Sequence, residues 1–460
     1  MEKNMQPPYG LEGAEKPEMD RDSIRRQSLV DQGETKFHKL GWIRLTVCLI
    51  VEAIALGSLG MPATFAKLGM VPGVLLSVFI GLIAIYTSYV VGQVYMRHPH
   101  IKDYADAVAL IWGRPGYMLT SVMFVLFLIL VVGSHSLTGT IAWIRLTEKT
   151  DVCALAWGIL SAVLLFLLAI PPTFTEFAIL GYIDFASICI AIMCTIVATG
   201  VQASKQAGGM SAVNWSMWPP DDITFSSAFL AVTNVVFAYS FAVCQFSFMA
   251  ELHTPKDYVK SIWALGLTEM VIYTLTGALV YAFVGQDVKS PALLSAGHTM
   301  SRVVFGIALP VIFISGSING TVACRYFISK VFANNEKVKY INTAQGWAWW
   351  IFLLAVATLI GWVVAEAIPI FNDLLGIISS LFISGFTFYF PALFWFCLVK
   401  QGKWYQGTKN IVLSLLNAVI FLVGMIVLVC GTYASIADIL ESYRSGSVRG
   451  AFTCSASAYG

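Results

Sequence analysis

Long apolar segments are the sequence feature that most restricts the fold of this chain. A membrane-crossing helix needs about 20 mainly apolar residues, and eleven such segments follow one another along the chain. None of them alternates apolar and polar residues as a barrel strand does. The sequence therefore predicts an all-α integral membrane protein with eleven transmembrane helices. Their expected positions are 43–68, 71–95, 117–145, 153–171, 175–201, 226–249, 259–284, 300–328, 345–365, 370–399 and 409–434.

Composition agrees with a membrane-embedded chain. Of the 460 residues, 58% are hydrophobic and 12% are charged, whereas soluble domains carry roughly 25% charged residues. The net charge of +2 gives no support for nucleic-acid binding. We therefore expect the lipid bilayer as a partner and no nucleic acid. No motif indicates a cofactor, a metal or an obligate protein partner.

The distribution of lysine and arginine predicts the orientation. If the N-terminus is cytoplasmic, 20 of the 28 Lys and Arg residues fall on the cytoplasmic side and 8 on the other, as the positive-inside rule expects. Residues 1–40 are charged and poor in aromatics, which predicts a disordered cytoplasmic tail. A transporter domain then covers 41–440, and an extracellular C-terminal tail covers 441–460.

Two features on the predicted outer side indicate modification. Asn214-Trp215-Ser216 is a glycosylation sequon in the longest predicted outer loop. Cys153 and Cys454 also lie on this oxidising side, and we hypothesise that they form a disulfide. Spacing alone does not fix connectivity, so free thiols remain the alternative.

The first predicted span contains material unsuited to a continuous helix. Gly57 and Gly60 are followed by Pro62; glycine loses backbone entropy in a helix and proline removes a donor. An unwound backbone within the membrane is tolerated where it lines a cavity, and its exposed N–H groups bind carboxylates. A kink, or close helix packing through small residues, is the alternative.

The sixth predicted span carries a polar patch without Gly or Pro. It includes Asn234, Tyr239, Ser240 and Gln245. Spans one and six would be equivalent members of two five-helix halves, the plan in which substrate binds at discontinuous helices near the midplane. The halves would cover about 43–201 and 226–399, with an extra helix at about 409–434.

Several runs resemble a known family. Gly57-Ser58-Leu59-Gly60-Met61-Pro62 resembles the first-helix signature of the amino acid/auxin permease family, and Tyr104-Ala105-Asp106 through Gly113 resembles its helix between spans two and three. The chain is also similar to the fungal neutral amino acid permeases of system N, the methyltryptophan-resistance type. That similarity covers about residues 36 to 440. The longest matching runs are 49–58, 179–185, 237–242, 290–297, 310–319 and 381–386.

The resemblance implies a fold and a function. The fold would be LeuT-like, with five-plus-five inverted repeats and one appended helix. The function would be proton-coupled import of neutral aliphatic and aromatic amino acids across the plasma membrane, with the vacuolar membrane as the alternative location.

The resemblance also implies a substrate site. Backbone amides of the first helix would hold the substrate carboxylate, and carbonyls of the sixth helix would accept from the ammonium group. Phenylalanines of spans six and ten would form an apolar wall, although ordinary packing is the alternative for each. These residues are Gly57, Ser58, Leu59, Gly60, Phe237, Ala238, Tyr239, Ser240, Phe241, Phe382 and Phe386.

Ionisable residues within spans are costly and commonly functional. Burial favours the protonated carboxyl and water access the ionised one, which gives a physical route to proton coupling. Glu52 is the first candidate and Asp184 the second, followed by Glu269 and His135. A gating salt bridge or a satisfied hydrogen bond is the alternative for each.

Sodium-coupled transport, amino acid sensing and enzymatic activity are the alternative functions. Ser315, Ser317 and Asn319 in span eight lie where sodium-coupled relatives of this architecture place cation ligands. A non-transporting amino acid sensor can retain the same fold. An enzyme would need a converging nucleophile and base; His135 has no companion motif, so we expect no catalytic residues.

Overall fold

Helices form the whole framework of the described chain. The computed structural model describes residues 41–149, 151–172, 177–333, 335, 338, 341, 343–446, 448 and 450–454. The predicted tail at 1–40 lies outside these residues. The longer helices and helical segments are α2 (Trp42–Leu68), α3 (Met70–Arg97), α4 (Tyr104–Thr147), α5 (Ala154–Ala169), α6 (Phe177–Lys205), α7 (Phe225–Ala238), α9 (Tyr258–Val284), α10 (His298–Val331), α12 (Ala344–Ala367), α13 (Phe371–Ile378), η6 (Ser379–Tyr389), α15 (Gly407–Ile426) and α16 (Thr432–Arg444).

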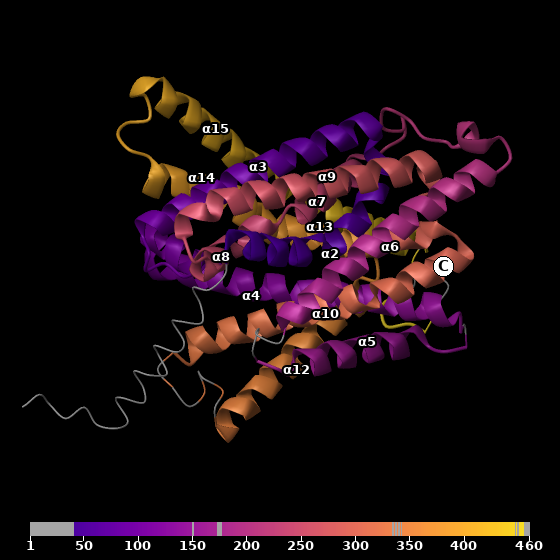
Figure 1. Cartoon of the computed structure of the whole chain (residues 1–460), viewed down its shortest axis with the longest axis horizontal. Coiled ribbons are helices and arrows are strands. Elements are labelled where there is room, and N and C mark those ends of the chain that lie inside the picture. Colours follow the sequence, from indigo (N-terminus) through magenta and orange to yellow (C-terminus); the bar gives the residue numbers. More distant parts are fainter. Residues whose placement is uncertain are drawn as a thin grey trace, which may run out of the picture.

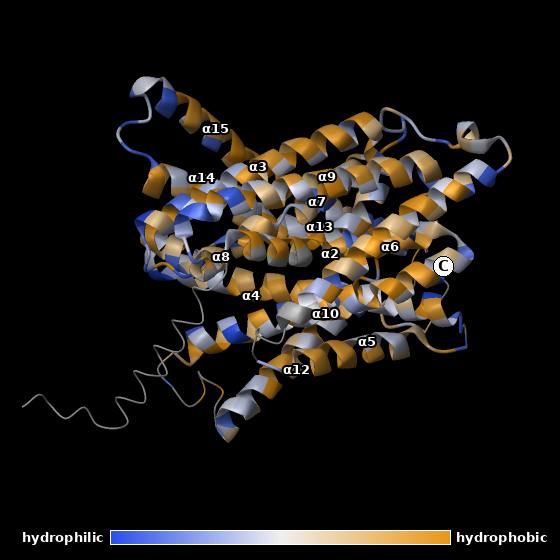
Figure 2. Ribbon diagram, in the orientation of Figure 1, coloured by the Kyte–Doolittle hydropathy of each residue, from blue (hydrophilic) through white to orange (hydrophobic). Residues whose placement is uncertain are grey.

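The helices coincide with the predicted spans. Nine helices in the described part of the chain are long and apolar enough to cross a membrane. Apolar residues dominate the middle of these helices, and polar residues gather toward the two ends of the bundle (Figure 2). At 16 residues, α5 is shorter than the roughly 20 that a crossing requires. The all-α membrane fold is therefore present, while the count of eleven spans stays a prediction.

The helices pack as two groups. In the first group α9 packs against α2 and α3, and α2 also packs against α7. In the second, α4 packs against α5, α10 and α12. Figure 1 shows α3 and α9 in its upper part and α5, α10 and α12 in its lower part. Because α6 contacts α2, α9 and α10, it connects the two groups.

The start of α4 is a separate helical segment. The Asp103 side chain accepts a hydrogen bond from the Asp106 N–H at 3.1 Å, which caps the helix. Gly113 then adopts φ 63°, ψ −149°, a conformation that a side chain disfavours, and Pro115 follows it. The short helix expected from Tyr104 to Gly113 is therefore present, and it meets the long part of α4 at a kink.

The C-terminal end differs from the prediction. The appended helix was expected to end near 434, but α16 continues to Arg444. Its extension is amphipathic and anchored, because the Tyr443 hydroxyl donates to the Ala367 carbonyl at 2.7 Å. The predicted tail at 441–460 therefore begins within a helix.

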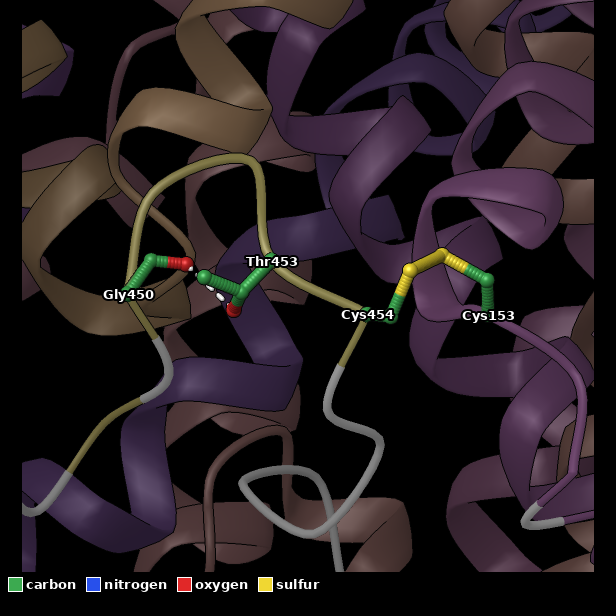
Figure 3. The surroundings of a disulfide bond; sticks show 4 residues. All are labelled: Cys153, Gly450, Thr453 and Cys454. Atoms are coloured by element: carbon green, nitrogen blue, oxygen red, sulfur yellow. Dashed lines mark hydrogen bonds between the residues drawn. A yellow bond between two sulfur atoms is a disulfide. The ribbon is translucent and has the colours of Figure 1, made fainter.

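A disulfide joins the C-terminal tail to the chain before α5. Cys153 and Cys454 are bonded, with their Cα atoms 4.3 Å apart (Figure 3). The Ala154 N–H also donates to the Cys454 carbonyl at 3.2 Å. The tail is thereby held beside the start of α5, as the pairing hypothesis expected.

We predict that non-reducing peptide mapping will recover the Cys153 and Cys454 peptides as one linked species. Both lie on the predicted oxidising side, where disulfides persist. Cys454→Ser should remove the linked species. The free, partly buried Cys189 is the control and should be alkylated with or without reduction. Recovery of both thiols in alkylated form before reduction would contradict the pairing.

Candidate functional site

The expected break in the first span is absent. α2 is helical from Trp42 to Leu68 with Pro62 inside it, so the prediction of an unwound segment at Gly57–Gly60 is wrong for this conformation. Gly57 serves close packing instead, since a Cβ there would lie 2.8 Å from Ala238 Cα. The Ser58 hydroxyl donates to the Ile54 carbonyl at 2.8 Å, a bond typical of a continuous helix.

The break in the sixth span is present. α7 ends at Ala238, and Tyr239 and Ser240 leave the helical path before η2 (Phe241–Cys244) and α8 (Gln245–Glu251) continue. The Tyr239 hydroxyl forms a hydrogen bond with Ser77 Oγ at 2.8 Å. Its ring packs edge-on against Tyr273, with centroids 5.2 Å apart. Contacts with α3 and α9 therefore hold the interruption in place.

A central cavity lies beside this break. Its volume is about 80 Å³. Four predicted substrate residues, namely Gly57, Phe237, Ser240 and Phe241, are among those that line it. Phe127 and Phe248 add aromatic wall, while polar atoms come from His135, Ser315 and Asn319. The structure thus brings together predicted residues of spans one, three, six and eight.

The other predicted substrate residues lie outside the central cavity. Ser58, Leu59, Gly60, Ala238 and Tyr239 are buried in helix contacts rather than in its lining.

The predicted contribution of span ten to the wall is wrong for this conformation. Phe382 and Phe386 do not line the central cavity. Phe386 packs against the Tyr104 ring at 5.1 Å, and its carbonyl accepts from the Tyr104 hydroxyl at 2.9 Å. Phe127 and Phe248 take the aromatic positions instead. No motif distinguishes these two among 30 phenylalanines, so they could not be selected from the sequence alone.

Glu269 is one of the fully buried candidate proton carriers. Its side chain is fully buried on α9, and neither carboxylate oxygen has a hydrogen-bond partner among the described residues. It lies close enough to Tyr239 and Tyr273 to interact electrostatically. The Tyr273 hydroxyl in turn donates to the Ala53 carbonyl at 2.7 Å, and Ala53 lines the central cavity.

The remaining candidates are placed differently. His135 is buried in the cavity wall, and its Nδ1 has no hydrogen-bond partner within the described residues. Asp184 is fully buried on α6, away from the cavity lining. The Glu52 side chain lies outside what the structure describes.

Two carboxyl groups that were not among the predicted site residues lie together between α13 and α16. Asp373 on α13 and Asp438 on α16 lie close enough to interact electrostatically. No motif marks either residue, because the pair exists only through the packing of α16 on α13.

Two of the three residues predicted for the alternative sodium site lie together at the central cavity. Ser315 and Asn319 line the central cavity, and the Asn319 amide donates to the Ser315 carbonyl at 2.9 Å. The Ser317 hydroxyl donates to the Ile314 carbonyl within α10.

The candidate glycosylation site is accessible. Asn214 is exposed in the chain between η1 (Gly209–Ala212) and α7.

Comparisons with known proteins agree with this architecture. The family model described as transmembrane amino acid transporter protein matches residues 38–437. The N amino acid transport system protein of Neurospora crassa is 58% identical over 424 residues, covering 92% of this chain and 90% of that relative. A transmembrane transporter of Fusarium pseudograminearum is 26% identical, covering 92% and 91%.

Solved structures show the same fold. Mhp1, a nucleobase-cation-symport-1 family transporter in a closed conformation, superimposes with a TM-score of 0.53 at 12% identity, covering 89% of this chain and 93% of that one. Its inward-facing conformation gives 0.54 at 12% identity, covering 89% and 91%. The fold is therefore that of a LeuT-like transporter.

The function class follows from the family. Its members and the relatives named above are transporters rather than enzymes, and amino acids are the substrates that the family description names. The match extends over nearly all of the helical domain. The chain therefore belongs to the transmembrane amino acid transporter protein family.

Proposed function

We propose that the protein imports neutral aliphatic and aromatic amino acids by proton symport with alternating access. The observation that carries the proposal is the central cavity beside the break between α7 and η2. Its aromatic wall of Phe127, Phe237 and Phe241 suits an apolar side chain, because phenylalanine rings carry no polar group that such a side chain would leave unpaired. The similarity to the N amino acid transport system protein supports amino acids as the substrates.

The break supplies groups for the ends of the zwitterion. Carbonyls at the end of α7, from Phe237 to Ser240, would accept hydrogen bonds from the substrate ammonium group, because the end of a helix leaves carbonyls without intrahelical donors; that of Ser240 also accepts from the Val243 N–H at 3.0 Å. The amides of Gly57–Gly60 lie within continuous α2, where each N–H bonds four residues back. Binding of the carboxylate by these amides therefore requires local opening of α2, which the two glycines and Pro62 make less unfavourable.

The size of the cavity supports a conformational change. At about 80 Å³ it is well below the roughly 300 Å³ or more of typical small-molecule sites. A whole amino acid therefore enters only when α2 and α7 move relative to α4 and α10, which also line the cavity. Such movement between the two helix groups is the alternating-access step of the transport cycle.

Glu269 becomes the first candidate for proton coupling. It is fully buried beside the two tyrosines that fix the break, so its protonation state acts on the same segment that holds the substrate. Glu52, Asp184 and His135 remain further candidates. Sodium coupling through Ser315, Ser317 and Asn319 is the alternative.

The proposed topology is that of the sequence analysis. Eleven spans, five-plus-five repeats and one extra helix place the N-terminus in the cytoplasm and the C-terminus outside. The disulfide between Cys153 and Cys454 and the exposed sequon at Asn214 agree with an oxidising outer side. We assign the protein to the plasma membrane, with the vacuolar membrane as the alternative.

The test is uptake of radiolabelled leucine and phenylalanine by proteoliposomes that contain the purified protein. An inward proton gradient is compared with an inward sodium gradient, each with and without a protonophore. We expect accumulation that requires the proton gradient and collapses with the protonophore. Accumulation driven by sodium alone would overturn proton symport and favour the span-eight site.

A measurement of leucine and phenylalanine binding to the folded protein completes the test. If the folded protein binds leucine but never transports it, the transport proposal is wrong and a sensor is favoured. If it neither binds nor transports leucine or phenylalanine, while transporting a charged amino acid, the proposed substrate class is wrong.

A further inference from the structure

A second cavity lies between the central cavity and the end of the bundle where α3 ends and α4 begins. Its volume is about 270 Å³, and it is lined by the start of α4, the far end of α10, and residues of η2 and α8. The positive-inside rule assigns this end to the cytoplasm. No predicted substrate residue belongs to its lining.

The two cavities share a wall. Val243 in η2 lines both of them, so the segment that follows the helix break separates the two. A substrate that leaves the central cavity past Val243 therefore enters the second cavity. This cavity is the larger of the two, with about 270 Å³ against about 80 Å³.

The lining of the second cavity complements an apolar amino acid. Arg325 of α10 lines it together with the apolar side chains of Phe124, Phe246 and Val322. A guanidinium group has a planar fork that binds carboxylates in a bidentate manner. Aromatic and aliphatic side chains at the same place accept a hydrocarbon group without leaving a buried polar group unpaired.

An ion-pair network holds the rim of this cavity. Lys330 Nζ lies 2.6 Å from Asp103 Oδ2 and 3.2 Å from Asp106 Oδ1. It also lies over the rings of Tyr117 and Tyr326, at 5.0 Å and 5.4 Å from their centroids. Because these three side chains are only 19–28% exposed, the ion pairs fix the end of α10 against the start of α4. Arg325, just over one turn before Lys330, is thereby kept at the cavity wall.

We propose that the second cavity is a release site for amino acids with apolar side chains, in which Arg325 receives the substrate carboxylate. The proposal rests on the proposed function and adds a residue and a place to it. The substrate passes from the central cavity across Val243, rests with its side chain against Phe124 and Phe246, and then leaves toward the α3–α4 end.

The experiment compares the two faces of the transporter. Full-length protein is reconstituted in one orientation, and exchange of labelled leucine is measured against unlabelled leucine on each side. Arg325→Gln should raise the half-saturating concentration on the α3–α4 side about fivefold, since it removes a charge-assisted hydrogen bond. The value on the opposite side should stay within about twofold by the same reasoning. Arg325→Lys, which keeps the charge without the fork, should fall between.

Controls come from the same helix. Arg302→Gln, near the other end of α10 and about 44% exposed, should leave the α3–α4 side unchanged. Val322→Trp fills the cavity and should slow exchange from that side, whereas Val303→Trp, at a position 45% exposed, should not. This pair keeps the test valid if Arg325→Gln does not fold.

The outcomes separate this proposal from the proposed function. Equal changes on both faces, or none with either Arg325→Gln or Val322→Trp, would overturn the release site while transport itself stands. Absence of exchange by the wild-type protein with any amino acid would instead overturn the proposed function.

Discussion

Replacing Gly57 by alanine will lower amino acid uptake at least about tenfold, because overpacking a close contact costs about 1–3 kcal/mol. The added Cβ would lie 2.8 Å from Ala238 Cα and 3.1 Å from Ala238 Cβ. Backbone at that distance cannot rotate away as a flexible side chain does, so α2 and α7 must separate. They meet at the central cavity, where Gly57 and Phe237 both contribute to the wall. Initial-rate uptake of labelled leucine, normalised to membrane-inserted protein, is the measurement.

Gly306→Ala on α10, outside the lining of the central cavity, is the matched control. A Cβ at Gly306 meets its nearest atom, Leu146 Cδ2, at 3.6 Å, an ordinary contact, and the helix propensity of alanine exceeds that of glycine. Uptake should therefore stay within about threefold of wild type, by the same packing argument. An equal loss in both variants would contradict packing as the role of Gly57.

Replacing Glu269 by glutamine will abolish concentrative uptake while exchange of internal for external substrate continues. Glutamine keeps the shape of the side chain but cannot exchange a proton, so the gradient no longer drives accumulation. Exchange needs only the loaded form to move between its two faces. The buried position of Glu269 beside Tyr239 and Tyr273 makes the neutral amide a tolerable substitute for the protonated acid. Proton-driven accumulation and counterflow in the same proteoliposomes measure the two activities.

Two control variants test whether the loss of proton-driven accumulation is specific to Glu269. Asp287→Asn, at an exposed position after α9, should accumulate leucine as the wild type does. Asp184→Asn tests a second fully buried carboxyl that lies away from the cavity lining. If Glu269→Gln still accumulates leucine in response to the proton gradient, Glu269 is not the carrier. Loss in Asp184→Asn alone would transfer that role to Asp184.

The helical elements could be predicted from the sequence because their signal is local. The segment expected at 71–95 became α3, Met70–Arg97, and the one expected at 345–365 became α12, Ala344–Ala367. Both are apolar runs whose backbone groups must pair within the segment. α16 ran past its expected end for the opposite reason. Its last turns are polar, and contacts such as that of Tyr443 with Ala367 retain them as helix.

The candidate site was predicted only in part. Phe237, Ser240 and Phe241 line the cavity as the resemblance implied. Phe386 does not, because the Tyr104 hydroxyl and ring hold it in another part of the core. Which side of a long apolar helix faces a cavity depends on neighbouring helices, and an all-round hydrophobic helix carries no such information in its own sequence.

The sequence by itself determined the class of protein, its helical spans and its family, because apolar length and motif runs are properties of the chain. The tertiary structure alone decided where a helix breaks. α2 stays helical despite Gly57, Gly60 and Pro62, since Ala238 packs directly against Gly57. The sixth span opens at Tyr239 without glycine or proline, since hydrogen bonding to Ser77 holds that residue outside the helix. In each case contacts with neighbouring helices outweigh the local backbone preference, which in α2 amounts to about 1 kcal/mol for each glycine and about 3 kcal/mol for the proline.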